Sequence, residues 1–337
     1  MNKDFNLKCV IDPVVNTCIN NRIGGAVALG LNAFVVNPNN PDAYQTIQAA
    51  VDAAEAVAAA SATLLSQLIL VAPGIYTENL TVSEQGITIQ GWGKPPADAV
   101  AIGIGINLVA IVGDITLNSS LCLQDLTVVG HVVSTALFVS RTFSFTNCLI
   151  QPLSGDTSPA LNFVLGSSSV ILGKQSTVFA GGLATGSCMD ILSPNTSSFT
   201  DCNLSRGGIQ LDGAGSVFVA RDCRISALIE VAAGASSISP LSTMTLSHCD
   251  IISQNSVTIF SYLAAVATNT RLYMCNITPG GGGVWAVQTG AGVPVISYDI
   301  IGSRATAALV PDVATAVGFG FLFSPATVIQ AATPPGN

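Results

Sequence analysis

A short pattern built around a cysteine recurs along this chain from Leu121 onward. It reads apolar, any, apolar, any, Asn or Asp in most copies, Cys, any, Ile or Leu. The pattern appears around Cys148, Cys202, Cys223, Cys249 and Cys275, and degenerate copies place Leu126, Gln175 and Tyr298 at the cysteine position. The intervals between these positions are 22, 27, 27, 21, 26, 26 and 23 residues. Alternating apolar residues that return at such intervals indicate a solenoid, in which each repeat forms one coil of parallel strands.

The cysteines themselves are expected to be packing residues. The chain has nine of them but no C-x-x-C pair, and five recur at the spacing of one coil: Cys148, Cys202, Cys223, Cys249 and Cys275. Buried cysteine behaves as a small apolar side chain, so we predict an inward-facing ladder of free thiols and no metal site. Cys9 and Cys18 lie outside the repeats, and whether they form a disulfide stays open.

A short polar residue precedes the cysteine position in several copies. It is Asp125, Asn147, Asp201 or Asp222. Short polar side chains favour turns because they can bond to nearby backbone amides. We therefore expect these residues at the bend between two strands of each coil, in a structural role.

The segment from Tyr44 to Gly93 has the character of a solenoid's first turn. An Ala-rich stretch from Ala43 to about Ser66 predicts a helix, with Asp42 and Gln45 as a capping box. Short strands separated by Pro-Gly and Gly turns follow it. The helix would cover the open N-terminal end of the solenoid, where unpaired strand groups and core side chains would otherwise meet water.

Within this segment, Val71-Ala-Pro-Gly-Ile-Tyr-Thr-Glu-Asn-Leu-Thr-Val82 resembles the opening of the pectin-lyase-like right-handed parallel β-helix superfamily. It is most similar to the pectin methylesterase branch, whose coils also carry "F-x-N-C-x-I" segments like the one at Cys148. The resemblance implies an all-β, single-stranded right-handed parallel β-helix with an N-terminal capping helix. With the segments from Leu68 to Gly113, the repeats predict about ten coils.

Three regions are expected along the chain. Residues 1–40 are predicted to form an extended arm that docks on a partner, and residues 41–303 the capping helix and the solenoid. Residues 304–337 are predicted to close the C-terminal end or to pair with other subunits. There, Phe319, Phe321 and Phe323 alternate with other residues, as in a strand.

Composition limits the classes of function. Charged residues make up 9% of the chain, against about 25% in typical proteins, while hydrophobic residues make up 49%. No run of 18 apolar residues predicts a membrane span, and the scattered Lys and Arg do not predict nucleic-acid binding. The N-terminus lacks the apolar core of a signal peptide, which predicts an intracellular protein. The scarcity of charge favours an outer surface covered by other subunits, although an uncharged Thr/Ser/Asn-rich surface stays open as an alternative.

The resemblance to pectin methylesterases implies a specific catalytic pair. Asp156 falls at the general-acid position and Asp190 near the nucleophile. The chain departs from the family because Val133 replaces the oxyanion-binding glutamine and no Arg-Pro-Trp strand follows Asp190. His131 and His248 are too far apart in sequence to predict a metal or catalytic pair. We therefore predict no catalytic residues, no cofactor and no metal.

These observations predict a non-enzymatic structural protein. The expected form is a rigid β-helix, with a homotrimer favoured, built into a larger assembly such as a virion capsid, spike or surface component. The N-terminal arm would bind other structural or capsid proteins. The alternatives are a divergent pectin esterase-like enzyme that uses Asp156 and Asp190, or a glycan-binding attachment module.

Overall fold

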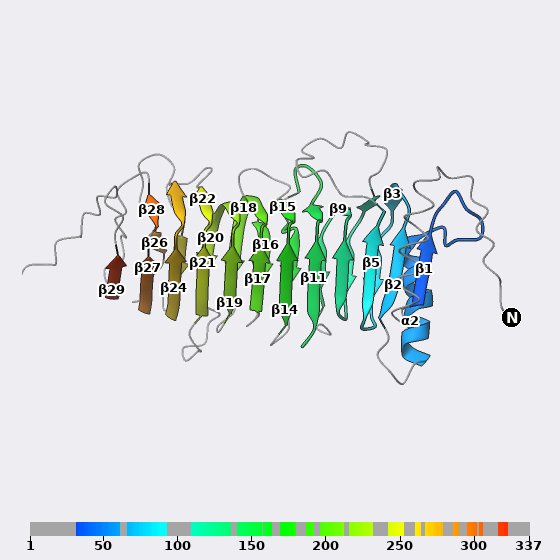
Figure 1. Ribbon diagram of the computed structural model, residues 1–337, viewed down its shortest axis with the longest axis horizontal. Helices are drawn as coiled ribbons and strands as arrows, with labels where there is room; N and C mark the ends of the chain where they lie inside the picture. The colour runs from blue at the N-terminus through cyan, green and yellow to red at the C-terminus, as the bar shows by residue number, and fades with distance from the viewer. Residues whose placement is uncertain are drawn as a thin grey trace, which may run out of the picture.

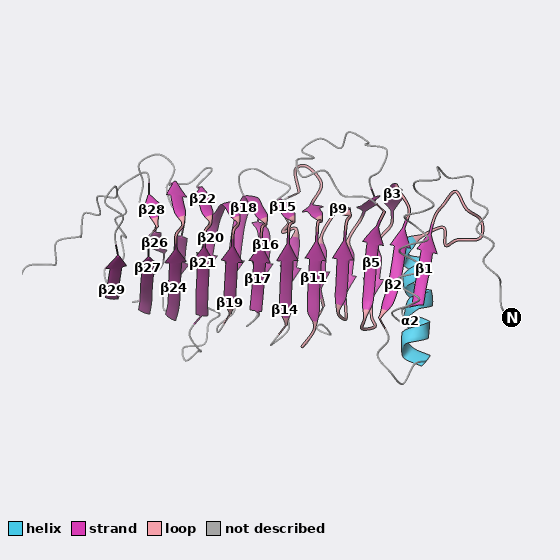
Figure 2. Ribbon diagram, viewed as in Figure 1, coloured by secondary structure: helices cyan, strands magenta, loops and turns pink. Residues whose placement is uncertain are grey.

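The computed structural model describes residues 32–60, 66–92, 109–135, 140–156, 158–163, 169–179, 187–191, 196–211, 216–231, 242–252, 260–263, 267–278, 286–289, 295–301, 303–305 and 316–322. In these segments one helix stands at the start of a long rod of parallel strands (Figures 1 and 2). Successive strands along the chain belong to different sheets, and each strand pairs with the equivalent strand of the next coil. This arrangement is the predicted parallel β-helix, with one helix near the N-terminus.

Three sheets run along the rod. Sheet A consists of β1 (Asn32–Val36), β2 (Gln67–Val71), β5 (Ile87–Gly91), β8 (Leu121–Gln124), β11 (Thr142–Thr146), β14 (Val170–Lys174), β17 (Thr196–Thr200), β19 (Val217–Arg221), β21 (Ser242–Ser247), β24 (Ala267–Tyr273), β27 (Val295–Ile301) and β29 (Ala316–Leu322). Sheet B contains β3 (Gly74–Thr77), β6 (Val109–Val112), β9 (Thr127–Val129), β12 (Leu149–Gln151), β15 (Thr177–Phe179), β22 (Asp250–Ile252), β25 (Asn276–Thr278) and β28 (Arg304–Ala305). Sheet C contains β4 (Leu80–Val82), β7 (Ile115–Leu117), β10 (Val132–Ser134), β13 (Leu161–Phe163), β16 (Ser187–Ile191), β23 (Phe260–Leu263) and β26 (Ala286–Thr289). The long strands β18 (Asn203–Leu211) and β20 (Arg224–Val231) take part in both B and C and so join them.

Stacked apolar side chains fill the interior of the rod. On sheet A, one inward row is continuous from Ile89 through Leu123, Phe145, Gly173, Phe199, Ala220 and Leu246 to Leu272. The side chains of this row are buried, as are those of the inward row of sheet B, where Ile111, Val128, Ile150, Val178, Leu204, Ile225, Ile251 and Ile277 follow one another. Burial of such continuous apolar columns is the main stabilising term of the fold.

Gly173 makes room for two phenylalanines in that row. Phe145 and Phe199 lie on the coils before and after Gly173, with ring centroids 6.3 Å apart. A Cβ atom at Gly173 would lie 2.6 Å from Cδ1 of Phe199 and 2.9 Å from Cζ of Phe145. The two rings therefore occupy the space that a side chain at position 173 would need.

The helix α2 (Ile47–Ala60) covers the N-terminal end of the core with Ile47, Ala50, Val51 and Ala54. Its first turn is capped from the first coil, because the carboxylate of Glu78 accepts the N–H groups of Ile47 at 2.8 Å and Gln48 at 2.9 Å. A carboxylate at this end of a helix is doubly favourable, since it satisfies orphan N–H groups and complements the helix dipole.

The predicted capping box and helix start are wrong. The helix begins at Ile47 rather than Ala43; it is described to Ala60, and the predicted end near Ser66 falls on residues 61–65, which lie outside the described residues. The amide of Gln45 donates to the backbone oxygens of Asn40 and Ala43, so it is not available as a cap. Glu78 shares the capping role with Thr46, whose Oγ1 accepts the N–H of Ala49 at 3.2 Å, and only the folded chain brings Glu78 next to the helix.

Helix side chains also pair with the first strand of sheet C. The amide of Gln48 accepts the N–H of Thr81 at 2.8 Å and donates to its carbonyl at 3.2 Å, as a neighbouring strand would. Glu55 accepts the N–H of Ser83 at 2.5 Å. The capping helix therefore satisfies backbone groups of an edge strand as well as covering the core.

Both ends of sheet A extend beyond the predicted solenoid. Strand β1 pairs in parallel with β2, so residues 32–36 belong to the rod and not to an N-terminal arm that ends at residue 40. Strand β29 pairs with β27, which confirms a strand in the predicted C-terminal segment. Residues 1–31, including Cys9 and Cys18, lie outside the described residues.

We expect Gly173→Ala to lower the free energy of unfolding by about 1–3 kcal/mol, because the methyl group overpacks the space between Phe145 and Phe199. Denaturant-induced unfolding measures the change, and Thr200→Ala, one strand away on the outward side of sheet A, serves as the control. Equal stability of Gly173→Ala and the wild type would contradict the close packing of the phenylalanine row.

Candidate functional site

The repeated cysteines form the predicted ladder. Cys148, Cys202, Cys223, Cys249 and Cys275 are free and buried at the first position after the bend between sheets A and B. The thiol of Cys202 donates to the carbonyl of Thr200 at 3.3 Å, two residues earlier, and the other four make the equivalent bond. Burial raises the pKa of the Cys148 thiol to about 12, so it is a neutral packing group with little reactivity.

Two of the degenerate repeats are corrected by the strand register. Leu149 pairs with Thr177 and Asn276 with Arg304, so the cysteine position is held by Ser176 rather than Gln175 and by Ser303 rather than Tyr298. The intervals thus become 22, 28, 26, 21, 26, 26 and 28 residues. The hydroxyl of each serine accepts the N–H of the cysteine one coil before it, at 3.0 Å, and thereby takes the place of a thiol.

The residues before the ladder share one backbone conformation. Asp125, Asn147, Gln175, Asp201, Asp222, His248 and Met274 have φ angles between 48° and 55°. Asn and Asp tolerate this left-handed conformation better than most residues, which explains their frequency here. Their predicted place at the bend is confirmed. The amide of Asn147 donates to the Asp125 carboxylate of the coil before it at 3.1 Å.

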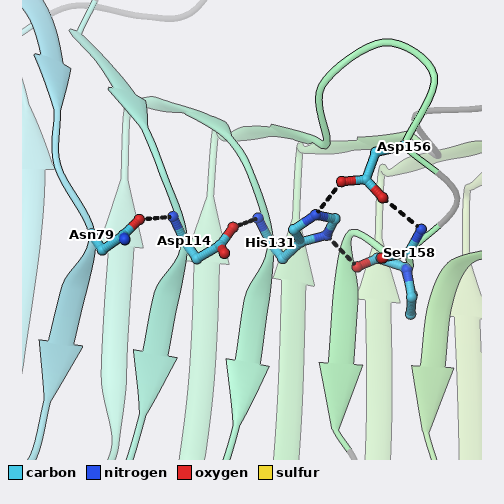
Figure 3. Close-up of polar contacts among 6 residues, drawn as sticks. Asn79, Asp114, His131, Asp156 and Ser158 are labelled. Carbon is cyan, nitrogen blue, oxygen red and sulfur yellow. Dashed lines mark hydrogen bonds and ion pairs between the residues drawn. The ribbon is translucent and has the colours of Figure 1, made fainter.

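A second row of polar side chains follows the turn between sheets B and C (Figure 3). The side chain of Asn79 accepts the N–H of Asp114 at 2.9 Å, and the carboxylate of Asp114 accepts the N–H of His131 at 2.9 Å. Gly113 and Gly130 precede this row with φ angles of 150° and 159°, and a Cβ at either would collide with the backbone of the coil before it. Close stacking of this turn therefore requires glycine at both positions.

His131 ends this row and holds Asp156, the candidate general acid. Nε2 of His131 lies 2.9 Å from Oδ2 of Asp156, and Nδ1 lies 2.9 Å from the carbonyl oxygen of Pro159. Oδ1 of Asp156 accepts the N–H of Ser158 at 2.8 Å. This bond and the His131 contact lower the pKa of the Asp156 carboxyl, which favours its ionised form. The cluster was not predicted from the sequence, because His131 and Asp156 lie 25 residues apart without a motif.

Asp190, the candidate nucleophile, lies in β16 of sheet C. Its register partners are Asn162 on the coil before and Gln210 on the coil after. Asp156 is in the loop between β12 and β13, and so it is not the residue stacked on Asp190. Val133, which stands where an oxyanion-binding glutamine was expected, pairs with Asn162. The strand register thus places Asp190 between Asn162 and Gln210, while Asp156 contacts His131.

The part of the chain that the structure describes contains no group of three or more His, Cys, Asp or Glu side chains placed to hold a metal ion. Among the same residues, no helix is long and apolar enough to cross a membrane.

The Asp156 contacts predict a pH-dependent contribution to stability. Because the pKa of Asp156 is lowered from 3.8 in the folded chain, its contribution is complete above pH 3.8 and is lost as the pH falls through the lowered value. Asp156→Asn should therefore be less stable than the wild type at neutral pH, by less than about 1 kcal/mol because the side chain is partly exposed.

Urea unfolding at neutral pH and at about pH 3 tests this difference, which should shrink in acid. Asp42→Asn, at an exposed carboxylate, is the control. A difference between Asp156→Asn and the wild type that stays constant over this range would contradict the assignment.

Comparison with known proteins shows a likeness of fold. No protein-family profile matches the chain, and no curated protein sequence matches it. Similar solved structures include pectin methylesterase PemA from Erwinia chrysanthemi, with 12% identity, a TM-score of 0.42, and coverage of 83% of this chain and 91% of that chain. The pectin methylesterase from Aspergillus niger has 15% identity, a TM-score of 0.45, and coverage of 87% and 92%. The structure is therefore similar to pectin methylesterases at low sequence identity.

Proposed function

We propose that this chain is a non-enzymatic structural protein, a rigid β-helix that assembles with copies of itself, with a homotrimer favoured. We propose further that the oligomer is built into a larger assembly such as a virion capsid, spike or surface component. The low charge of the whole chain, 9%, supports a surface that is covered in such an assembly.

The observation that carries this proposal is a pair of uncharged rows on the outside of sheet A, beside a third outward row that holds Lys174 and Arg221. Two neighbouring outward rows cross β11, β14, β17, β19 and β21. The first is Thr142, Val170, Thr196, Val217 and Thr243, and the second is Ser144, Leu172, Ser198, Val219 and Thr245. We call these ten residues the uncharged face. Leu172, near its centre, is 41% exposed. A flat patch that mixes methyl and hydroxyl groups without charge can be buried against another subunit at little desolvation cost.

The state of the candidate catalytic residues also supports a role without catalysis. A general acid must carry a proton at the working pH, whereas the Asp156 carboxyl has a lowered pKa and accepts bonds on both oxygens. Asp190 is stacked on Asn162, and an amide cannot act as general acid or base there.

We expect the purified protein to have a native mass of three times the 34.3 kDa chain mass in light scattering after size exclusion. Leu172→Glu should shift this mass to that of the single chain, because it places an unpaired carboxylate in the buried interface. Met274→Glu is the matched control, since Met274 is 57% exposed but lies on the bend between sheets A and B. A monomeric wild type, or an oligomer that Leu172→Glu leaves intact, would refute assembly through the uncharged face.

A second candidate function rests on the polar residues of sheet C. Asn162, Asp190, Gln210 and Glu230 occupy one register row over four successive coils. Amide and carboxylate residues at one register position of successive coils are residue types that suit the hydroxyl groups of a glycan chain, as substrate or as ligand. The test is hydrolysis and binding of methylated pectin by the wild type and by Asp190→Ala. Turnover that Asp190→Ala abolishes would favour the esterase over the structural protein, while binding without turnover would favour an attachment module. We expect neither.

A further inference from the structure

The imidazole of His131 is held between two hydrogen-bond acceptors. Nδ1 lies 2.9 Å from the carbonyl oxygen of Pro159, and Nε2 lies 2.9 Å from Oδ2 of Asp156 (Figure 3). A carbonyl oxygen cannot donate, and an ionised carboxylate cannot donate either. The ring must therefore supply a proton to each of the two contacts.

Only the protonated ring can make both contacts. Neutral imidazole carries one N–H, so one of its nitrogens would turn a lone pair toward an oxygen lone pair. The imidazolium carries two N–H groups and satisfies Asp156 and Pro159 together, with a charge-assisted bond to the carboxylate. Loss of one proton from His131 thus removes one of the two bonds.

Both acceptors belong to the loop from Pro152 to Ala160, which connects β12 of sheet B to β13 of sheet C. Backbone bonds anchor its ends to the preceding coil, from the N–H of Gly130 to Gln151 at 2.9 Å and from the N–H of Val132 to Ala160 at 2.9 Å. Between these anchors, the side chain of Leu153 is 59% exposed. The His131 ring reaches across to the loop between its two ends and fastens its middle to the same coil.

Two charged side chains contact His131 from the neighbouring coils. On the preceding coil, the turn before β7 carries Asp114, whose Oδ1 accepts the backbone N–H of His131 at 2.9 Å. On the following coil, the loop carries Asp156. These two carboxylates are the charged groups among the described residues of the two elements, and both are acidic. The lowered pKa of Asp156 keeps its negative charge at mildly acidic pH.

We propose that His131 is a pH-dependent latch, which holds Asp156 and Pro159 of the loop before β13 while its ring is protonated and loosens them when the ring loses a proton. The latch is closed while the ring carries both protons and is loosened once the ring loses one, so the loop should be held less firmly toward alkaline pH. The loop leads directly into β13, so the latch also controls how firmly the start of β13, next to Asn162, is held.

Hydrogen exchange of the loop amides, expressed as protection factors, tests the latch between about pH 5.5 and about pH 8.5. The chain contains two histidines, so in His248→Asn the ring signal of His131 is the single histidine signal in an NMR titration. Asparagine tolerates the left-handed backbone at position 248, and this variant should behave as the wild type. His131→Gln provides an amide that can donate but does not titrate.

In the wild type and in His248→Asn, we expect loop protection to fall about tenfold toward alkaline pH, the effect of one lost hydrogen bond. The midpoint should coincide with the titration of the His131 ring, and His131→Gln should show no such fall. Protection that stays constant while the ring titrates would overturn the proposal. So would a ring that carries one proton at about pH 5.5, or a fall that persists in His131→Gln. If His131→Gln does not fold, the comparison of ring titration and loop protection in His248→Asn still decides the matter.

Discussion

Parallel hydrogen bonding between successive coils is the constraint on which the rest of this structure depends. Each strand pairs in register with the same strand of the next coil, so every position meets its own equivalent one strand spacing away. A residue type that suits one coil therefore suits the next. This explains the thiol ladder, where a serine at position 176 or 303 replaces cysteine without loss of the hydrogen bond. It also explains the row of left-handed bends, where Asn147 bonds to Asp125, and the start of sheet B, where Asn276 of β25 bonds to Asp250 of β22.

The same constraint creates a difficulty at the ends, which the first coil and the capping helix solve together. Tyr76 of the opening motif points into the core and donates to the carbonyl of Ala72 at 2.8 Å, and burial raises its pKa to about 12. Glu78 of the same motif caps α2. In the other direction, the side chain of Gln48 on α2 hydrogen-bonds to the backbone N–H and carbonyl of Thr81 in the first coil. The motif thus places a core residue and a helix cap two positions apart.

Register also decides what the candidate site can do. The resemblance to pectin methylesterases implied Asp156 and Asp190 as a catalytic pair. The loop before β13 instead carries Asp156 away from the strand row to His131, and Asn162 takes the place beside Asp190. Extra residues in a loop change the number of residues between two positions, but they do not change which strand residues pair between coils. The spacing of two residues in the sequence therefore cannot reveal whether they are register partners. For the same reason, the contact between His131 and Asp156 could not be predicted from the sequence.

The sequence by itself determined the architecture of this protein. Alternating apolar residues at coil-length intervals, the Pro-Gly turn and the Ala-rich segment require a capped parallel solenoid, because each pattern reports local periodicity that the backbone must follow. It also determined the inward cysteine ladder and the bend residues that precede it. The tertiary structure alone decided the partners of individual side chains: Glu78 as helix cap, Ser176 and Ser303 in the ladder, and Asp156 bound to His131. Those contacts join residues far apart in the chain, and their distances follow from coil stacking and loop length, which no local pattern encodes.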